Sequence, residues 1–159
     1  MKTILSTILL LMSLQITPSL VFADEKIVKE IKYRQSAMMF MRWNMGTIKK
    51  QVVKKSETYN MNQVIASATV IEAISNSGLG KLFGDNTKQG TGWKETRIKP
   101  EFFEQPNEVR KRVSKFKKEA SALAQVAKTG NIEEIKDQFE KTFKACKGCH
   151  KKFRKKQPK

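Results

Sequence analysis

Residues 106–153 read PNEVRKRVSKFKKEASALAQVAKTGNIEEIKDQFEKTFKACKGCHKKF, and apolar side chains recur in them every three or four positions. This period is typical of amphipathic helices. Pro106 is acceptable at a first helical position, and Gly130 ends the first helix of the pair. Asn131, with Glu134 three positions later, is typical of a helix N-terminus and opens the second helix. Because the turn between them is so short, the two helices must pack antiparallel.

Each of these helices is expected to turn one apolar face toward a core. In the first, that face carries Val109, Val113, Phe116, Ala120, Leu123 and Val126. In the second, it carries Ile132, Ile135, Phe139, Phe143, Cys146, Cys149 or His150, and Phe153. The apolar stripe of the second helix therefore runs into the only two cysteines and the only histidine of the chain.

Two more helical runs precede this pair. The first spans about residues 25–54. Its inward positions are Ile27, Ile31, Arg34, Met38, Met41, Met45, Ile48 and Val52. The second begins at the capping pair of Asn60 and Gln63 and ends at Gly78. Its inward positions are Met61, Val64, Ala68, Ile71 and Ile74. No run alternates polar and apolar residues as a strand would, so the sequence predicts an all-α protein.

Residues 79–105 form a long connection between the second and third helices, because they hold half of the chain's glycines together with Pro100. Loops of this length in a compact domain are usually functional or cross the fold. The predicted fold is an antiparallel four-helix bundle with this one long connection.

The N-terminal residues are typical of an export signal. Lys2 gives a basic start, residues 4–12 are mostly apolar, and Val21-Phe22-Ala23 resembles a cleavage site. We expect residues 1–23 to be a signal peptide that is cleaved after Ala23, and residues 24–159 to form one domain in the periplasm. The apolar run is too short for stable membrane insertion.

The chain has a formal net charge of +17, and lysine dominates it. A surface of this kind is expected to be solvated and to steer acidic partners toward the protein. Nucleic acid is not an expected partner, because an exported protein rarely meets it and the aromatic interleaving of a single-strand groove is absent from the sequence.

Cys146-Lys147-Gly148-Cys149-His150 matches the C-x-x-C-H signature of covalent haem attachment. On a helix, thiols three positions apart lie on one side, where they reach adjacent vinyl groups of a porphyrin. The neighbouring His150 can then coordinate the iron. The predicted cofactor is one covalently bound haem c.

Three other uses of a motif with two cysteines fit this sequence less well. A thioredoxin-type thiol motif follows a strand and opens a helix, whereas this one lies late in a helix. A zinc site needs four ligands, and the chain offers two cysteines and one histidine. A disulfide fits an exported protein but leaves the adjacent histidine unexplained.

The whole predicted mature chain resembles the cytochrome c prime family. The resemblance rests on residues 32–37 (KYRQSA), 59–60 (YN), 82–84 (LFG), 99–101 (KPE) and 146–154 (CKGCHKKFR). The two end motifs are the specific ones.

The resemblance implies five-coordinate iron bound to His150, with a first-helix side chain, Met38, over the distal face. It implies that Arg154 lies beside His150 and weakens its push on the iron. Arg34 and Gln35 resemble residues that meet the haem propionates, and Phe83 resembles an aromatic residue packed on the haem. The low-spin alternative, in which Met38 is an axial ligand, stays open.

The resemblance further implies a role in binding nitric oxide or carbon monoxide, in transferring single electrons to an acidic redox partner, or in both. A homodimer through the first two helices is expected. An enzyme is not expected, because no second histidine and no acid–base pair accompany the haem motif.

Overall fold

The computed structural model describes residues 18–54, 57 and 59–156, and within these ranges it is helical without a β-strand. Its elements are α1 (Pro18–Val52), α2 (Met61–Asn76), the single-turn helices η1 (Leu79–Leu82), η2 (Asp85–Thr87) and α3 (Glu101–Glu104), α4 (Pro106–Ala127) and α5 (Ile132–Phe153). The four long helices form the expected bundle, and the long connection lies between α2 and α4.

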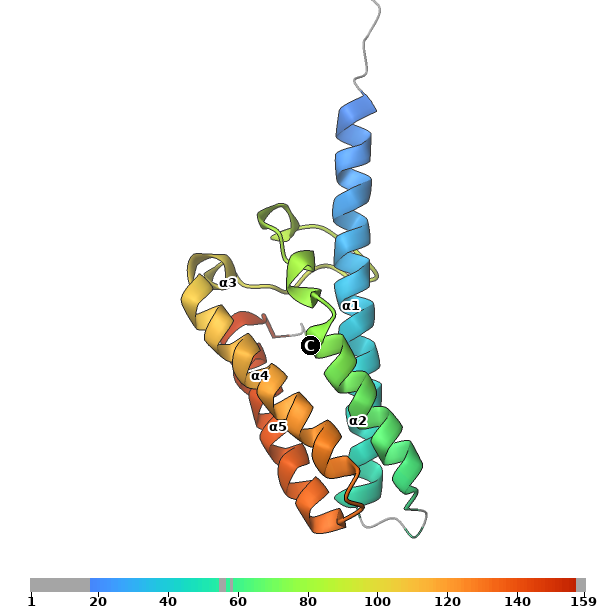
Figure 1. Cartoon of the computed structure of the whole chain (residues 1–159). Helices are drawn as coiled ribbons and strands as arrows, with labels where there is room; N and C mark the ends of the chain where they lie inside the picture. The colour runs from blue at the N-terminus through green and yellow to red at the C-terminus, as the bar shows by residue number, and fades with distance from the viewer. Residues whose placement is uncertain (1–17, 55–56, 58, 157–159) are drawn as a thin grey trace, which may run out of the picture.

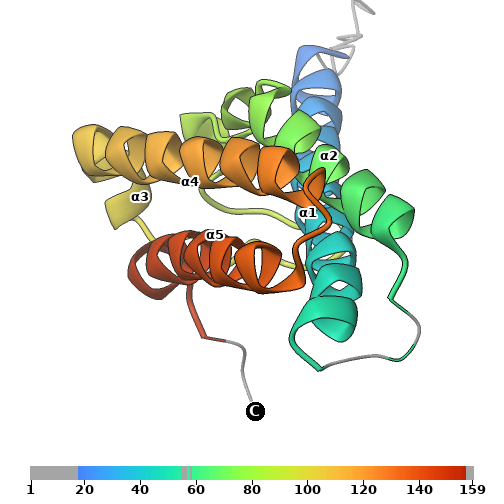
Figure 2. The ribbon, with the colours of Figure 1, turned by 60° about the horizontal axis from the view of Figure 1, so that its bottom comes forward.

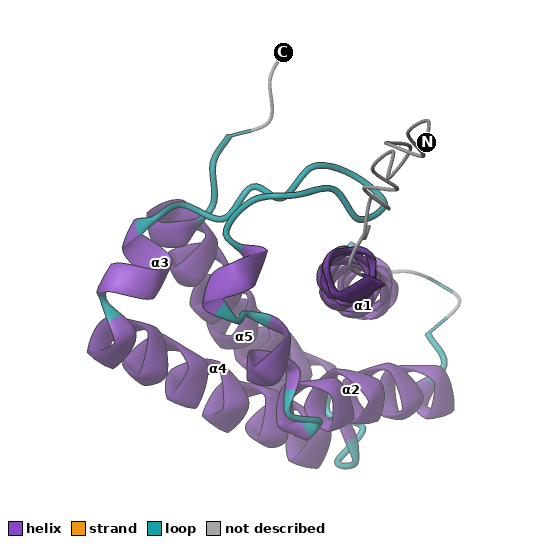
Figure 3. Cartoon of the chain, turned by 90° about the horizontal axis from the view of Figure 1, so that it is seen from above, coloured by secondary structure: helices purple, strands orange, loops and turns teal. Residues whose placement is uncertain are grey.

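The helices pack in two pairs. α4 and α5 lie side by side, and α1 runs beside α2 (Figures 1 and 2). Seen from above in Figure 3, the connection extends from the end of α2 toward α1 and returns to α3. The connection therefore bridges the two sides of the molecule.

The expected boundaries of the second to fourth helices are confirmed to within a few residues. α1 differs, because it begins at Pro18 and ends at Val52 rather than spanning 25–54. The expected cleavage point after Ala23 lies within this helix. Residues 1–17 lie outside the described residues, so the signal peptide stays a prediction.

Local caps set two of the helix starts. The Asn131 side chain accepts hydrogen bonds from the backbone N–H groups of Glu133 (3.1 Å) and Glu134 (3.3 Å). Asn60 caps α2 through the backbone N–H of Gln63, as expected. The return bond of a capping box comes from another residue, because Gln51 of α1 accepts from the Asn60 N–H at 2.8 Å. The cap thus also ties α1 to α2.

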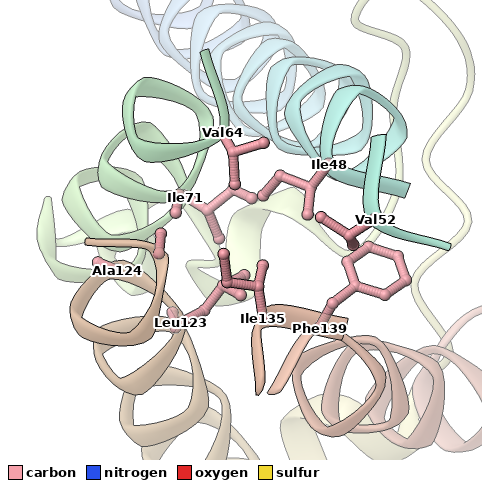
Figure 4. Packing of buried hydrophobic residues seen from close by; sticks show 11 residues of the cluster. Ile48, Val52, Val64, Ile71, Leu123, Ala124, Ile135 and Phe139 are labelled. Carbon is pink, nitrogen blue, oxygen red and sulfur yellow. The ribbon is translucent and has the colours of Figure 1, made fainter. Parts of the chain in front are cut away.

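The hydrophobic core lies where all four long helices meet, and Figure 4 shows its central members. Four positions predicted to be inward are instead exposed by more than a third: Met61, Val113, Ile132 and Phe143. Helical period alone cannot show where a neighbouring helix diverges and stops covering a face. No helix among the described residues is long and apolar enough to cross a bilayer.

Replacing Asn131 with Ala is expected to lower the free energy of unfolding by about 1 kcal/mol, because two backbone N–H groups lose their acceptor. Urea unfolding followed by circular dichroism measures this. Thr69→Ala, on an exposed position of α2, is the matched control and should change stability by less than about 0.5 kcal/mol. Equal unfolding midpoints for the two variants would contradict the capping role.

Candidate functional site

The last turns of α5 position the two cysteines and the histidine. Cys146 and Cys149 are three residues apart, which places both sulfurs on one side of the helix, and His150 is one turn beyond Cys146. All three are half-buried, and the two cysteines are not joined to each other by a disulfide. The arrangement matches the one that the sequence motif predicts.

Burial keeps both thiols protonated. It raises the pKa of Cys146 to about 11, and the nearby Cys149 adds to that rise. Burial also raises the pKa of Cys149, against the opposing charge of Arg112. A catalytic dithiol has the opposite property, a lowered pKa. The environment therefore argues against thiol-exchange chemistry.

His150 is held as neutral imidazole. Burial, together with the smaller effect of the positive charges of Arg154 and Arg97, lowers its pKa to about 4. A neutral imidazole keeps a nitrogen lone pair available for a metal at ordinary pH. The side chain is therefore suited to coordinate iron without first losing a proton.

The position of Arg97 beside the site was not foreseen from the sequence. The backbone of residues 97–99 pairs with that of 153–155: the Lys99 N–H donates to Phe153 O (3.0 Å) and the Lys155 N–H donates to Arg97 O (2.8 Å). This pairing fixes the end of the connection against the residues that follow the haem motif. A contact between segments so far apart in the chain leaves no local signal.

Arg42, Arg97 and Arg154, near the C-terminal end of α5, have no ion-pair partner among the described residues. Charge from Arg97 and Arg42 lowers the pKa of Arg154, after burial as the main cause. Within the part of the chain that the structure describes, none of these three guanidinium groups is in an ion pair, whereas Arg112 pairs with Glu108 at 2.7 Å. Arg97 and Arg154 act on the histidine by their charge, and Arg42 acts on Arg154. Unpaired guanidinium groups of this kind are suited to hold carboxylates of a ligand.

Gly148 allows α4 to lie close to the motif. A Cβ at this position would lie 3.2 Å from Nη1 of Arg112, tighter than ordinary contact. The Arg112 guanidinium therefore lies directly against Gly148, and its charge acts on the neighbouring Cys149. This contact too was missed, because it depends on how α4 and α5 align.

The apolar surface around the motif fits a flat apolar ring. Phe143 lies one turn before Cys146 on the same face of α5, and it stacks on Phe139 with ring centroids 6.2 Å apart while 45% exposed. A porphyrin bonded to the two thiols could cover such a face. The donor set and its surroundings thus fit a covalently attached haem.

Met38 is half-buried on α1, one turn before Arg42 on the same face. Since Arg42 acts electrostatically on Arg154, this face of α1 is directed toward the end of α5. The position of Met38 is therefore compatible with the distal role expected of it, which stays a prediction.

Arg34 is buried and binds the connection. Its guanidinium donates to the carbonyls of Leu82 (3.0 Å) and Thr87 (2.9 Å) and to the hydroxyls of Thr87 and Thr96. It also lies over the ring of Phe83, 5.1 Å from the centroid. These contacts give it a structural role, and the expected propionate contact stays a prediction.

Gln35 binds the same connection. Its amide oxygen accepts from the N–H groups of Trp93 (2.8 Å) and Lys94 (3.2 Å), and its amide nitrogen donates to Lys94 O (2.8 Å). Phe83 stacks on Phe102, with centroids 5.1 Å apart, and Phe102 meets Phe153 edge to face. Phe83 thus belongs to an aromatic cluster that includes Phe153, which lies three positions after His150.

Replacing Arg34 with Met is expected to lower the free energy of unfolding by about 2–4 kcal/mol, because buried acceptors lose a charged donor. Urea unfolding measures this, and Lys81→Met on the exposed surface of η1 is the control. Unchanged stability together with a shifted reduction potential of the haem protein would instead indicate that Arg34 acts on a propionate.

Comparison with known proteins also indicates a protein that binds haem c. The model of the cytochrome c' family matches residues 29–154. The cytochrome c' of Allochromatium vinosum is 43% identical over 155 residues, which cover 97% of this chain and 99% of that protein. A solved cytochrome c' with a ligand-controlled dimer dissociation has a TM-score of 0.77 and 44% identity, over 82% of this chain and 97% of that one. A nitric oxide complex of a variant cytochrome c' from Alcaligenes xylosoxidans has a TM-score of 0.70 and 25% identity, over 80% and 94% of the two chains.

Proposed function

Since the chain belongs to the cytochrome c' family, whose members bind haem c covalently, we propose that Cys146 and Cys149 hold the haem and that His150 is its axial ligand. The observation that carries this is the grouping of two half-buried cysteines and one half-buried histidine on a single face of α5. When bound, the haem supplies an iron that takes up a diatomic gas or a single electron.

The protein's own residues orient and protect this group. His150 presents a nitrogen lone pair, and Arg154 and Arg97 disfavour any further proton on its ring. The unpaired guanidinium groups of Arg42, Arg97 and Arg154 would meet the haem carboxylates. On the other face, Met38 offers an apolar side chain, and no second histidine exists in the chain to act there as a proton donor or ligand.

The function that this site supports best is binding of a small neutral diatomic gas. An apolar distal face admits nitric oxide or carbon monoxide once Met38 moves aside, and it disfavours anions, which would be desolvated without a partner. The relative from Alcaligenes xylosoxidans was solved with nitric oxide. The alternative is a low-spin electron-transfer site with Met38 as sixth ligand.

Exposed apolar residues on α1, together with a relative that forms a dimer, support a homodimer for this protein. Met39, Phe40 and Trp43 are each at least half exposed on α1, and Met39 and Trp43 line a shallow hollow with Gly46. We propose that this apolar face pairs two copies through α1 and α2, as a relative described as a dimer suggests. Export by residues 1–23 would place the protein in the periplasm.

Covalent attachment of the haem is tested by measuring the intact mass of the exported protein by mass spectrometry. Exported protein is expected to carry the added mass of one haem, and the double variant Cys146→Ala/Cys149→Ala should lose it completely. Ser121→Ala, distant from the motif, is a control for export. A wild-type mass equal to that of the bare polypeptide would contradict the proposal.

Met38→Ala is expected to speed carbon monoxide binding to the reduced protein by at least about tenfold, because the entering gas no longer displaces a side chain from the distal face. Stopped-flow absorption measures this, with Gln125→Ala on the exposed surface of α4 as control. If Met38 is instead the sixth ligand, the wild-type spectrum will be low-spin and Met38→Ala will convert it to high-spin.

A further inference from the structure

The positive charge of the chain gathers at one end of the α4–α5 pair. Residues 106–118 and 141–156, here called the attachment end, contain fourteen lysines and arginines and a single acidic residue, Glu108. Eleven of the fourteen are exposed. They are Arg110, Lys111, Lys115, Lys118, Lys141, Lys144, Lys147, Lys151, Arg154, Lys155 and Lys156.

The alignment of the two helices makes this a single region. Gln138 and Thr142 both donate to the carbonyl of Glu119, and Arg112 lies against Gly148. The basic half of α4 is therefore beside the basic half of α5. The two cysteines and His150 lie within the same stretch.

The other end of the α4–α5 pair carries more acidic than basic residues. Residues 119–140, the turn end, contain five acidic residues against Lys128 and Lys136. Near the attachment end, the exposed acids are Glu101 and Glu104 of α3, and Glu108 is already paired with Arg112. The charges of the helix pair thus form a strong dipole whose positive pole surrounds the candidate haem site.

We propose that the attachment end is a docking surface for an acidic one-electron redox protein, which exchanges an electron with the haem there. The inference rests on the proposed haem attachment. A dipole of this kind orients a protein as it approaches a negative surface and raises the association rate. The orientation it selects presents the haem motif to the partner.

The composition of the surface favours an acidic protein over a lipid bilayer. An interfacial helix needs a broad apolar face that enters the membrane. At the attachment end, the large apolar side chains exposed by more than a third are Val113 and Phe143, and most of the exposed positions are lysines or arginines. A lysine-rich surface with few apolar anchors suits a transient, salt-sensitive complex.

The exchange is one electron between the haem iron and the metal or flavin centre of the partner. One centre is oxidised, the other is reduced, and no proton or group moves. The residues of the attachment end belong to α4, α5 and the segment after α5, whereas the apolar face proposed for the dimer belongs to α1.

A gold electrode coated with a carboxylate-terminated monolayer serves as the acidic surface, and cyclic voltammetry of the holoprotein gives the electron-transfer rate constant. Lys115→Glu/Lys144→Glu/Lys151→Glu is expected to lower it at least about tenfold at about 10 mM ionic strength. The control Lys49→Glu/Lys54→Glu/Lys128→Glu carries the same net charge at the opposite end and should change it less than about twofold. At about 0.5 M salt the difference should vanish, because screening is then short-ranged.

Each other outcome overturns the proposal. Equal losses in both triple variants would show that only net charge matters, and no loss in either would show that docking uses another face. Binding of the wild type to phosphatidylglycerol vesicles at about 0.15 M salt, abolished by the attachment-end variant alone, would assign the surface to lipid. Absence of haem from the purified chain is a separate failure, that of the proposed attachment, and it is seen by mass before any electrode measurement.

Discussion

The antiparallel packing of α4 on α5 determines where the two cysteines, His150 and the basic surface around them lie. The short turn before Asn131 leaves the two helices one relative alignment, in which the carbonyl of Glu119 accepts from Gln138 and Thr142. That alignment puts Arg112 against Gly148 and desolvates the two thiols. A shift of one helical turn would separate the arginine from Cys149 and divide the basic halves of the helices.

The second constraint is the connection, which links α1 to the end of α5. Its first part is held by buried Arg34, and its last part pairs with the backbone of residues 153–155. The side chain expected over the distal face, Met38, is one turn beyond Arg34. The connection therefore spans from the distal side of the candidate site to its proximal side, which explains why so long a loop is retained in a small bundle.

The helices, their caps and the haem motif could be predicted from the sequence, whereas the contacts between distant segments could not. The difference has a physical cause. The cap at Asn131 and the C-x-x-C-H motif depend on residues within one helical turn, so their pattern is visible locally. The partners of Arg34 are 48 to 62 positions away, and Arg97 reaches His150 only through the folded connection. Contacts of that kind depend on tertiary packing, which no local period records. The exposure of Phe143, predicted to be inward, has the same origin.

Gathering so many like charges at one end costs free energy, and the structure keeps that cost low. Most of the cations are exposed, where water and salt screen their repulsion. The C-terminus of α5 is the negative pole of its helix dipole and favours the lysines and arginine around it. Lys152, which is half-buried, lies over the ring of Phe153, 5.5 Å from its centroid. Only Arg112, beside Cys149, is neutralised by a carboxylate. Because the other charges are stabilised by solvent and dipoles rather than by fixed acidic partners, their field stays available to a negatively charged protein.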